Sequence, residues 1–390
     1  MQVVSILSKH LSKVMHKTRF QTLCVLVESL FHAKFFNLTG LGRALKTDAQ
    51  ERSAIRRVDR FLGNTGIQKD RINIYQTVCT LVIGSSKRPW IVVDWSPIPN
   101  QPHQVLRAAL VSTGRALILY EEIHPEKKYT NARVHARFLI KLKSLLANDV
   151  QPIIVTDAGF HNSWFNMVLE LGWDYVGRIR GNKTYRVSND HKWAPITSLY
   201  PEATSTPKCL GEIELCKENT LKTTLYRYKS HEKGRHRKTK RGNLLRNSQS
   251  KKHAKANKEP WLLVSSLKES YSCSKKVIEI YSCRMQIEEG FRDLKSTKYG
   301  FGFEHVNTVH IYRLNVFFLI AMLAAFLAWV IGFLAESMNL QTQYQANSTR
   351  NRRVLSLFYL GYRIILRGKN YMKKIPIQSL IDNFPNFCEV

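Results

Sequence analysis

The chain has 390 residues, 44% of them apolar, and 60 Lys and Arg against 29 Asp and Glu give a net charge of +31. This composition excludes a disordered chain, and the length suits two or three domains. The charge and a pI near 10.0 favour a polyanionic partner, nucleic acid first and an anionic membrane surface second. Seven scattered cysteines are unlike a secreted disulfide framework, and residues 1–17 show no export signal, so a cytoplasmic location is expected.

Residues 1–75 are predicted to form a helical DNA-binding domain. An apolar-rich helix is expected at 20–36, and two short helices separated by a turn at 46–48 should follow. Three arginines share one face of the second short helix: Arg52, Arg56 and Arg60. A helix with one apolar face for packing and one cationic face for phosphates suits a DNA-binding motif like the helix-turn-helix. The alternative is a charged face that is only solvated.

From residue 89 the pattern changes to strands. The expected elements are three strands, a helix, a strand, a helix and a strand, at 90–96, 103–112, 116–123, 133–147, 152–157, 162–171 and 173–180. The order βββαβαβ is the layout of a ribonuclease-H-like core. We therefore predict a mixed α/β fold of this type.

Aspartates stand at the ends of two of these strands. Asp94 ends the first strand and Asp157 the fourth. Taken singly, each is most simply a turn former or a helix N-cap. Together with the later Glu288 they could instead converge at one sheet edge, where three carboxylates would repel one another without a divalent cation.

Residues 183–261 interrupt this core and are expected to be rich in strands. Between Arg227 and Lys258 there are thirteen Lys and Arg against one acid, which predicts a basic arm that orders on DNA or a solvated loop. Four residues invite a zinc interpretation: Cys209, Cys216, His231 and His236. The six-residue gap between the cysteines is longer than usual for zinc sites, so zinc is disfavoured.

The run from Leu314 to Ala335 has 22 residues and no charge, which is long enough for a membrane span. A buried central helix is favoured, since this is the only such run in a strongly basic chain. Beyond it, residues 346–370 form a basic amphipathic stretch that could contact DNA or a second subunit. The predicted domains are 1–75, 76–182 (first part of the core), 183–261, 262–345 (second part of the core) and 346–390 (C-terminal helical region).

The stretch from Tyr281 to Lys295 is the most informative in the chain. On a continuous helix, four polar residues would fall on one stripe: Tyr281, Arg284, Glu288 and Lys295. A carboxylate flanked by cations and a phenol suits a site that holds a metal ion and a phosphate backbone. A surface pair of Arg284 and Glu288 is the simpler alternative.

These residues and their surroundings resemble a known protein family. The spacing of the four polar residues matches the YREK signature of bacterial cut-and-paste insertion-sequence transposases of the DDE class, insertion-sequence family four. The segments VVDWS around Asp94 and VTDAGF around Asp157 are also similar to that family, as is RMQIEEGFRDLKS around Glu288. The resemblance covers essentially the whole chain.

The resemblance implies roles for individual residues. Asp94, Asp157 and Glu288 would be the catalytic triad that coordinates two Mg²⁺ ions, with Mn²⁺ as a substitute; Glu288 rather than Glu289 has the signature spacing. Further residues would contact DNA: Tyr281, Arg284 and Lys295 at phosphates near the scissile bond, with Arg178 and Arg180 as weaker candidates. Trp261 resembles the tryptophan that related transposases use to receive a flipped base, although its spacing differs by about one residue and it could be core.

By the same resemblance, the protein would act as a homodimer in the bacterial nucleoid, on double-stranded DNA, without a membrane. It would cleave terminal inverted repeats, form a hairpin, reopen it and join the ends to target DNA. Two alternatives stay open. One is a nuclease on the same core that cuts without strand transfer, and the other is a catalytically silent protein that binds transposon ends.

Overall fold

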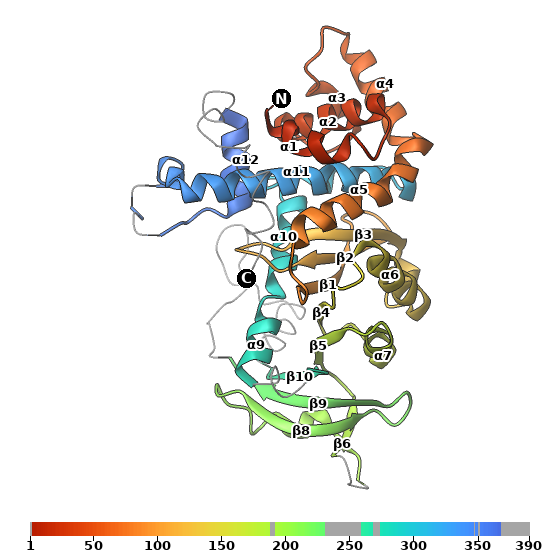
Figure 1. Ribbon diagram of the computed structural model, residues 1–390, viewed down its shortest axis with the longest axis vertical. Coiled ribbons are helices and arrows are strands. Elements are labelled where there is room, and N and C mark those ends of the chain that lie inside the picture. The colour runs from red at the N-terminus through yellow and green to blue at the C-terminus, as the bar shows by residue number, and fades with distance from the viewer. Residues whose placement is uncertain are drawn as a thin grey trace. The chain divides into compact units, whose positions relative to one another are not determined.

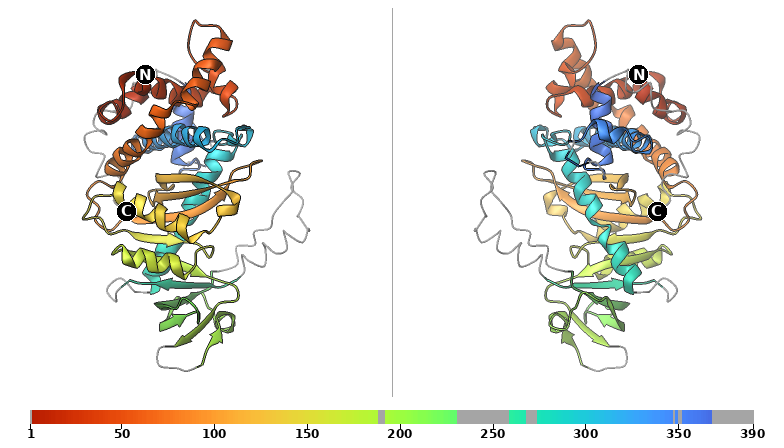
Figure 2. Two further views of the ribbon diagram at one scale, coloured as in Figure 1. Left: turned by 90° about the vertical axis from the view of Figure 1, so that its right-hand side faces the viewer. Right: turned by 90° about the vertical axis from the view of Figure 1, so that its left-hand side faces the viewer.

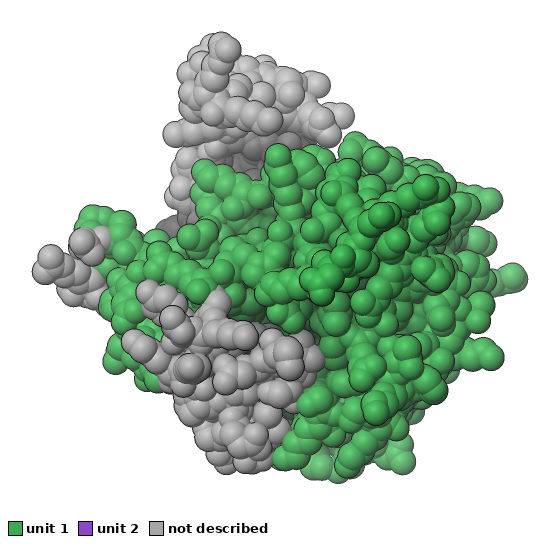
Figure 3. Space-filling view, turned by 90° about the horizontal axis from the view of Figure 1, so that it is seen from above, with its two compact units in different colours: residues 1–150, 285–390 green, residues 151–284 purple. Residues whose placement is uncertain are grey.

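The computed structural model describes residues 2–187, 192–230, 259–267, 274–346, 348–349 and 352–367. The chain divides into two compact units. Unit 1 comprises residues 1–150 and 285–390, and unit 2 comprises residues 151–284. Two segments far apart in the sequence therefore build unit 1, which Figure 3 shows as one continuous body. The five predicted domains stay a prediction.

Unit 1 begins with the helices expected from the sequence. They are α1 (Gln2–Leu11), α2 (Lys17–His32), α3 (Leu38–Arg43), α4 (Glu51–Leu62) and α5 (Thr65–Ile83). Helix α4 buries Ala54, Val58 and Leu62. Gly42 lets α3 approach α4 closely, because a Cβ at this position would lie 2.6 Å from Ile55. The two short helices with an intervening turn are thus confirmed.

The first three strands form an antiparallel meander in unit 1, as predicted. They are β1 (Trp90–Pro97), β2 (His103–Leu110) and β3 (Leu117–Pro125), with β2 between the other two. A short 3-10 turn (Glu126–Lys128) leads into helix α6 (Ala132–Leu145). Figures 1 and 2 show α6 on one face of these strands and helix α10 (Met285–Lys295) on the other.

The long apolar helix α11 (Ile311–Ser337) is the core helix of unit 1. It is the one helix among the described residues that is long and apolar enough to cross a membrane, yet 89% of its most apolar window is buried inside the protein. It packs against α2, α5 and β3. Burial, which the sequence favoured, is therefore confirmed.

Helix α12 (Leu357–Arg367) packs on α11 at unusually short range. A Cβ on Gly361 would lie 1.8 Å from the carbonyl oxygen of Ala328, and a Cβ on Gly332 would lie 1.9 Å from that of Leu357. The apolar face of this predicted amphipathic stretch is thus occupied by α11. Two 3-10 turns complete the described part of unit 1, at Phe303–His305 and Leu340–Gln343.

Unit 2 is a sheet with helices. Strand β4 (Ile153–Thr156) pairs in parallel with β5 (Asp174–Ile179), and β10 (Trp261–Ser265) pairs antiparallel with β5. Helix α7 (Asn162–Glu170) lies against β5, where Gly177 leaves room for the ring of Phe165. Helix α9 (Ser274–Ser282) packs against β4, β5 and β9.

The interrupting segment extends this sheet. Its strands are β6 (Thr184–Val187), β7 (Ala194–Pro195), β8 (Lys208–Leu215) and β9 (Leu221–Tyr228), with a 3-10 turn at Ile196–Leu199. Strand β9 pairs with β10 and with β8, and β8 pairs with β6. The expected strands are therefore present, while most of the basic arm, residues 231–258, lies outside the described residues. The mixed α/β architecture is confirmed.

Candidate active site

Asp94 lies near the carboxyl end of β1 and is buried. The apolar residues before it place this strand inside unit 1, and the alternation of the strand turns Asp94 and Ser96 to the same face. One carboxylate oxygen accepts the backbone N–H of Trp95 at 2.8 Å. On the opposite face, the indole N–H of Trp95 donates to Nε2 of His135 on α6 at 2.9 Å. The strand end that presents Asp94 is thus held from both sides.

Helix α10 presents two neighbouring glutamates with different surroundings. Glu288 is exposed in its first turn. Glu289 pairs with Arg115 at 2.5 Å and with Arg292 at 3.7 Å. The geometry thus gives Glu289 a structural partner in the turn after β2. The choice of Glu288 as the signature residue stays a prediction.

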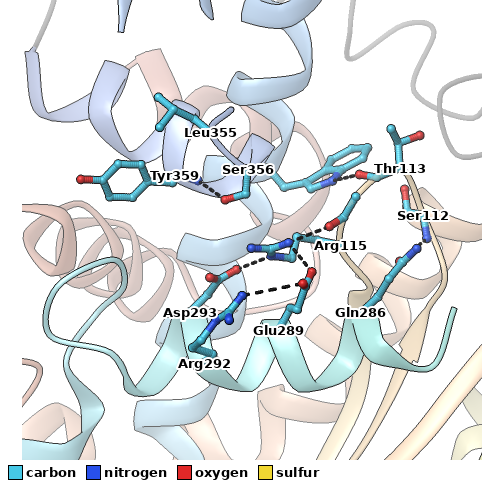
Figure 4. Close-up of polar contacts among 12 residues, drawn as sticks. Ser112, Thr113, Arg115, Gln286, Glu289, Arg292, Asp293, Leu355, Ser356 and Tyr359 are labelled. Atoms are coloured by element: carbon cyan, nitrogen blue, oxygen red, sulfur yellow. Dashed lines mark hydrogen bonds and ion pairs between the residues drawn. The ribbon is translucent and has the colours of Figure 1, made fainter. Parts of the chain in front are cut away.

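Three contacts hold α10 against that turn, as Figure 4 shows. Gln286 accepts the backbone N–H of Ser112 at 3.2 Å, and Arg115 reaches both Glu289 and Asp293. Asp293 is buried, and its burial raises the pKa of its carboxyl group while Arg115 lowers it. Since residues 286, 289 and 293 share one side of the helix, the register of α10 on the sheet of unit 1 is fixed.

Lys295 ends α10 beside the end of β1. Its ammonium donates to Oγ of Ser96 at 2.7 Å and to the carbonyl oxygen of Pro97 at 2.6 Å. Burial and the nearby Arg107 lower the pKa of Lys295 to about 8, while Asp94 opposes this shift. Lys295 and Asp94, 201 residues apart in the sequence, are therefore electrostatic neighbours in unit 1.

This pKa predicts a pH dependence of DNA binding. Lys295 is charged below about pH 8, and a bound phosphate raises its pKa further, so its contribution is full below pH 8 and falls as the pH rises. Without divalent ions, we expect the affinity for a DNA duplex to fall between pH 7 and pH 9.5. Lys295→Arg should flatten the profile, because arginine keeps its charge. Fluorescence anisotropy would measure the pH profile of binding for the wild type and for Lys295→Arg. Identical profiles would contradict the assignment of Lys295 as a phosphate contact.

The signature helix is not continuous, which corrects the prediction of a single helical stripe. Helix α9 ends at Ser282 and α10 begins at Met285. Between them, the N–H groups of Cys283 and Arg284 donate to the carbonyl groups three residues earlier, which tightens the turn. Tyr281 and Arg284 therefore belong to unit 2, and Glu288 and Lys295 to unit 1.

Unit 2 gathers the remaining signature residues around Tyr281. This tyrosine is buried, and the guanidinium carbon of Arg284 lies 5.9 Å from its ring centre. Burial raises the pKa of Tyr281, with Arg284 and Arg178 lowering it and Asp157 raising it. The ring of Trp261 meets that of Tyr281 edge-on at 4.9 Å. Five predicted site residues are thus close together in unit 2.

Asp157 follows β4 and is half-buried. One carboxylate oxygen accepts the backbone N–H of Gly159 at 2.8 Å, so the side chain does form the local turn that the simpler interpretation expects. Such a turn uses one oxygen and leaves the other for a further ligand. The turn role and a ligand role are therefore compatible.

Arg178 in β5 and Arg180, which follows the end of β5, differ in how their guanidinium groups are bound. Arg178 donates to the carbonyl oxygen of Pro260 at 3.4 Å, while its Nε is buried with no hydrogen-bond partner among the described residues. Arg180 pairs with Glu259 at 2.5 Å. Arg178 therefore has donor capacity left within unit 2, whereas Arg180 would have to exchange Glu259 for a phosphate.

The predicted cationic face of α4 is exposed, since Arg52, Arg56 and Arg60 all face outward. Arg60 also lines a hollow of about 480 Å³ together with Arg19 and Arg57, which the sequence reasoning did not single out. Arg19 is held by Asp70 at 2.7 Å. A solvated face and a phosphate-binding face both fit this arrangement.

Comparison with known families decides the class of protein. A family model described as Transposase DDE domain matches residues 85–328, more than half of the chain. The chain belongs to this DDE transposase family. A search of curated proteins finds no match. Family membership supports a transposase function with DNA as the partner, and DDE transposases typically use a divalent metal.

The carboxylates of this DDE transposase have the chemistry of a Mg²⁺ site, since Mg²⁺ prefers hard oxygen ligands. Asp94 and Glu288 lie in unit 1 and Asp157 in unit 2. Within the described part of the chain, no three His, Cys, Asp or Glu side chains are grouped closely enough to hold a metal ion. The joint triad and its two ions therefore stay a prediction. For zinc, Cys209 and Cys216 are free thiols, and both histidines lie outside the described residues.

One feature of the site was missed from the sequence. Arg107 on β2 lies directly opposite Asp94 on β1 and opposite Glu121 on β3. It is 1% exposed, pairs with Glu121 at 2.8 Å and lies 4.2 Å from the ring centre of Phe291 on α10. The available signal was charge within two mostly apolar strands: Arg107 in β2, and Glu121 with Glu122 in β3.

Proposed function

We propose that this DDE transposase belongs to insertion-sequence family four and resembles the transposase of the tetracycline-resistance transposon Tn10. It would move an insertion sequence by cut-and-paste transposition, acting as a homodimer on terminal inverted repeats and target DNA. The observation that supports this best is Lys295 beside Asp94, because it joins the last residue of the YREK signature to a catalytic aspartate in one unit.

In this proposal Asp94, Asp157 and Glu288 hold the metal. Two Mg²⁺ ions, when bound, would activate the attacking oxygen and stabilise the leaving oxygen. Lys295 would bind a phosphate near the scissile bond and keep it close to Asp94, because its ammonium group already points at the end of β1. Tyr281, Arg284 and Arg178 would bind the neighbouring phosphates from unit 2.

The test is a transposon-end duplex whose sequence comes from inverted repeats flanking the gene. With Mg²⁺ and plasmid DNA, the proposal expects strand cleavage, a hairpin end and a covalently joined donor-target product. Cleavage without a joined product would favour the nuclease alternative. Tight end binding without cleavage in Mg²⁺ or Mn²⁺ would favour the catalytically silent alternative.

Trp261 gives a prediction of its own. Its half-buried ring is packed between Tyr228, at 5.6 Å, and Tyr281. If it receives a flipped base, Trp261→Ala should remove a stacking contact of about 1–3 kcal/mol and slow hairpin formation by about tenfold or more. Gel analysis of single-turnover reactions would measure hairpin and nicked species separately.

A matched control is Trp193→Ala, which removes a half-buried tryptophan that lies 5.1 Å from the guanidinium of Arg186. This variant should form hairpins at the rate of the wild type. An equal loss in both variants would mean that Trp261 only supports the fold of unit 2, and Trp261→Phe should restore most of the rate if stacking is its role.

A further inference from the structure

An open hollow of about 830 Å³ lies at the beginning of α6 in unit 1. Three cations line it: Lys128, Arg133 and Arg137. Among the described residues of its lining there is no Asp or Glu. From Glu126 to Arg137 the sequence holds four Lys and Arg, counting Lys127, against one acid, Glu126. A concave surface of this charge fits an extended polyanion better than a neutral or cationic partner.

The three cations are available to a ligand. All three are exposed, and none forms a side-chain hydrogen bond or ion pair with another described residue. Glu122, the carboxylate that interacts with Arg137 over a distance, is already engaged by His124 at 2.9 Å and by Tyr120 at 2.5 Å. Arg133 and Arg137 are like charges four residues apart on one helix, and a bound phosphate would remove their repulsion.

The side chains, and not the helix end, would form this site. Oδ1 of Asn131 accepts the backbone N–H groups of Arg133 at 3.1 Å and Val134 at 3.2 Å, which caps α6 internally. Tyr129, 49% exposed, lies next to the cations and contacts Trp95 at 5.7 Å. Cations beside an exposed aromatic ring are typical of nucleic-acid surfaces.

The hollow lies at the sheet edge where Asp94 stands, but on the opposite face. Strands β1 and β3 run in the same direction, so Pro97 and Pro125 end at the same edge, and α6 begins there. The hydrogen bond from Trp95 to His135 ties α6 to this edge. Helix α10 with Lys295 covers the other face (Figure 2).

We propose that this hollow binds the phosphate backbone of target DNA. The inference rests on the proposed function, in which the α10 face holds the transposon end. The sheet separates that face from the hollow, so a duplex in the hollow is a second DNA segment. Its lining offers cations for phosphates, which bind DNA without reading its sequence, and this suits target DNA better than a second inverted repeat. Lys128, Arg133 and Arg137 would hold its phosphates close to the edge where the 3′-hydroxyl attacks.

The test removes the three cations together, with Lys128→Ala, Arg133→Ala and Arg137→Ala in one full-length protein. Cleavage of the transposon end should stay within about twofold of the wild type, while joining to a plasmid should fall by about tenfold or more. The salt dependence of binding should also weaken, since each lost phosphate contact lowers the slope by about 0.9. A control with Lys87→Ala, Lys141→Ala and Lys143→Ala removes equal charge from unit 1 outside the lining of the hollow.

DNA binding by the hollow can be measured without cleavage or joining. Anisotropy with a plain duplex that lacks the inverted repeat should show about fivefold or more weaker binding by the hollow variant than by the control. Equal losses of cleavage and joining would assign the hollow to the transposon end and overturn the proposal. Unchanged joining and unchanged plain-duplex binding would also overturn it. If the wild type neither cleaves nor joins, the proposed function fails, and plain-duplex binding still decides whether the hollow binds DNA.

Discussion

Glu288→Gln should lower the rate of transposon-end cleavage by on the order of 10³-fold, because a neutral amide would replace the proposed carboxylate ligand of the metal, which is worth several kcal/mol of transition-state stabilisation. The fold should be almost unaffected. Glu288 is exposed in the first turn of α10, where loss of its charge costs less than about 1 kcal/mol. Single-turnover cleavage in Mg²⁺ and urea unfolding would measure the two effects separately.

The neighbouring glutamate provides the matched control. Glu289→Gln removes a carboxylate whose side chain is 37% exposed and pairs with Arg115, which keeps its second partner Asp293 at 2.7 Å. We expect cleavage close to that of the wild type and a loss of stability below about 1 kcal/mol. If the Glu289→Gln variant loses cleavage while the Glu288→Gln variant keeps it, the triad must be reassigned to Glu289.

Much of the fold could be predicted because its signals are local. Residues 90–96 and 152–157 are short, mostly apolar runs with turn residues beside them, and the structure has strands at both. The turn after β2 contains Gly114, whose φ of 75° is unfavourable for other residues. The long apolar run could be interpreted as a buried helix because its charge-free length was unique in the chain.

The break in the signature helix could not be predicted. Between Tyr281 and Met285 there is neither glycine nor proline, so nothing in the local sequence marks a helix end. The turn coincides with the boundary between the two units, which depends on contacts distant in sequence. Spacing alone thus identified the residues, while their division between α9 and α10 required the structure.

The surroundings of Lys295 could not be predicted from the sequence either. Its acceptors Ser96 and Pro97 lie almost 200 residues earlier in the chain, at 199 and 198 positions. A lowered pKa depends on burial and on neighbours such as Arg107, neither of which helical spacing reveals. Sequence reasoning could therefore name Lys295 as a phosphate contact but could not give its charge state.

The second large effect concerns the buried pair of Arg107 and Glu121. Their side chains are 2% and 1% exposed, and Nε of Arg107 lies 2.8 Å from the carboxylate. Burial raises the pKa of Glu121, and Arg107 opposes this shift. Arg107→Met would leave the buried carboxylate of Glu121 without its ion-pair partner, with only Arg71 and Tyr75 still stabilising its charge, so we expect a loss of about 3–5 kcal/mol in the free energy of unfolding, measured in urea.

The double variant Arg107→Met with Glu121→Leu separates the pair's role in the fold from its role in the site. Replacing both charges with apolar groups removes the desolvation cost, so stability should return to near the wild-type value or exceed it. Cleavage should stay low, because Arg107 lies opposite Asp94 and contacts Phe291 on α10, and so joins the strand of one proposed catalytic carboxylate to the helix of the other. If the stable double variant cleaves like the wild type, the pair serves only the packing of the sheet.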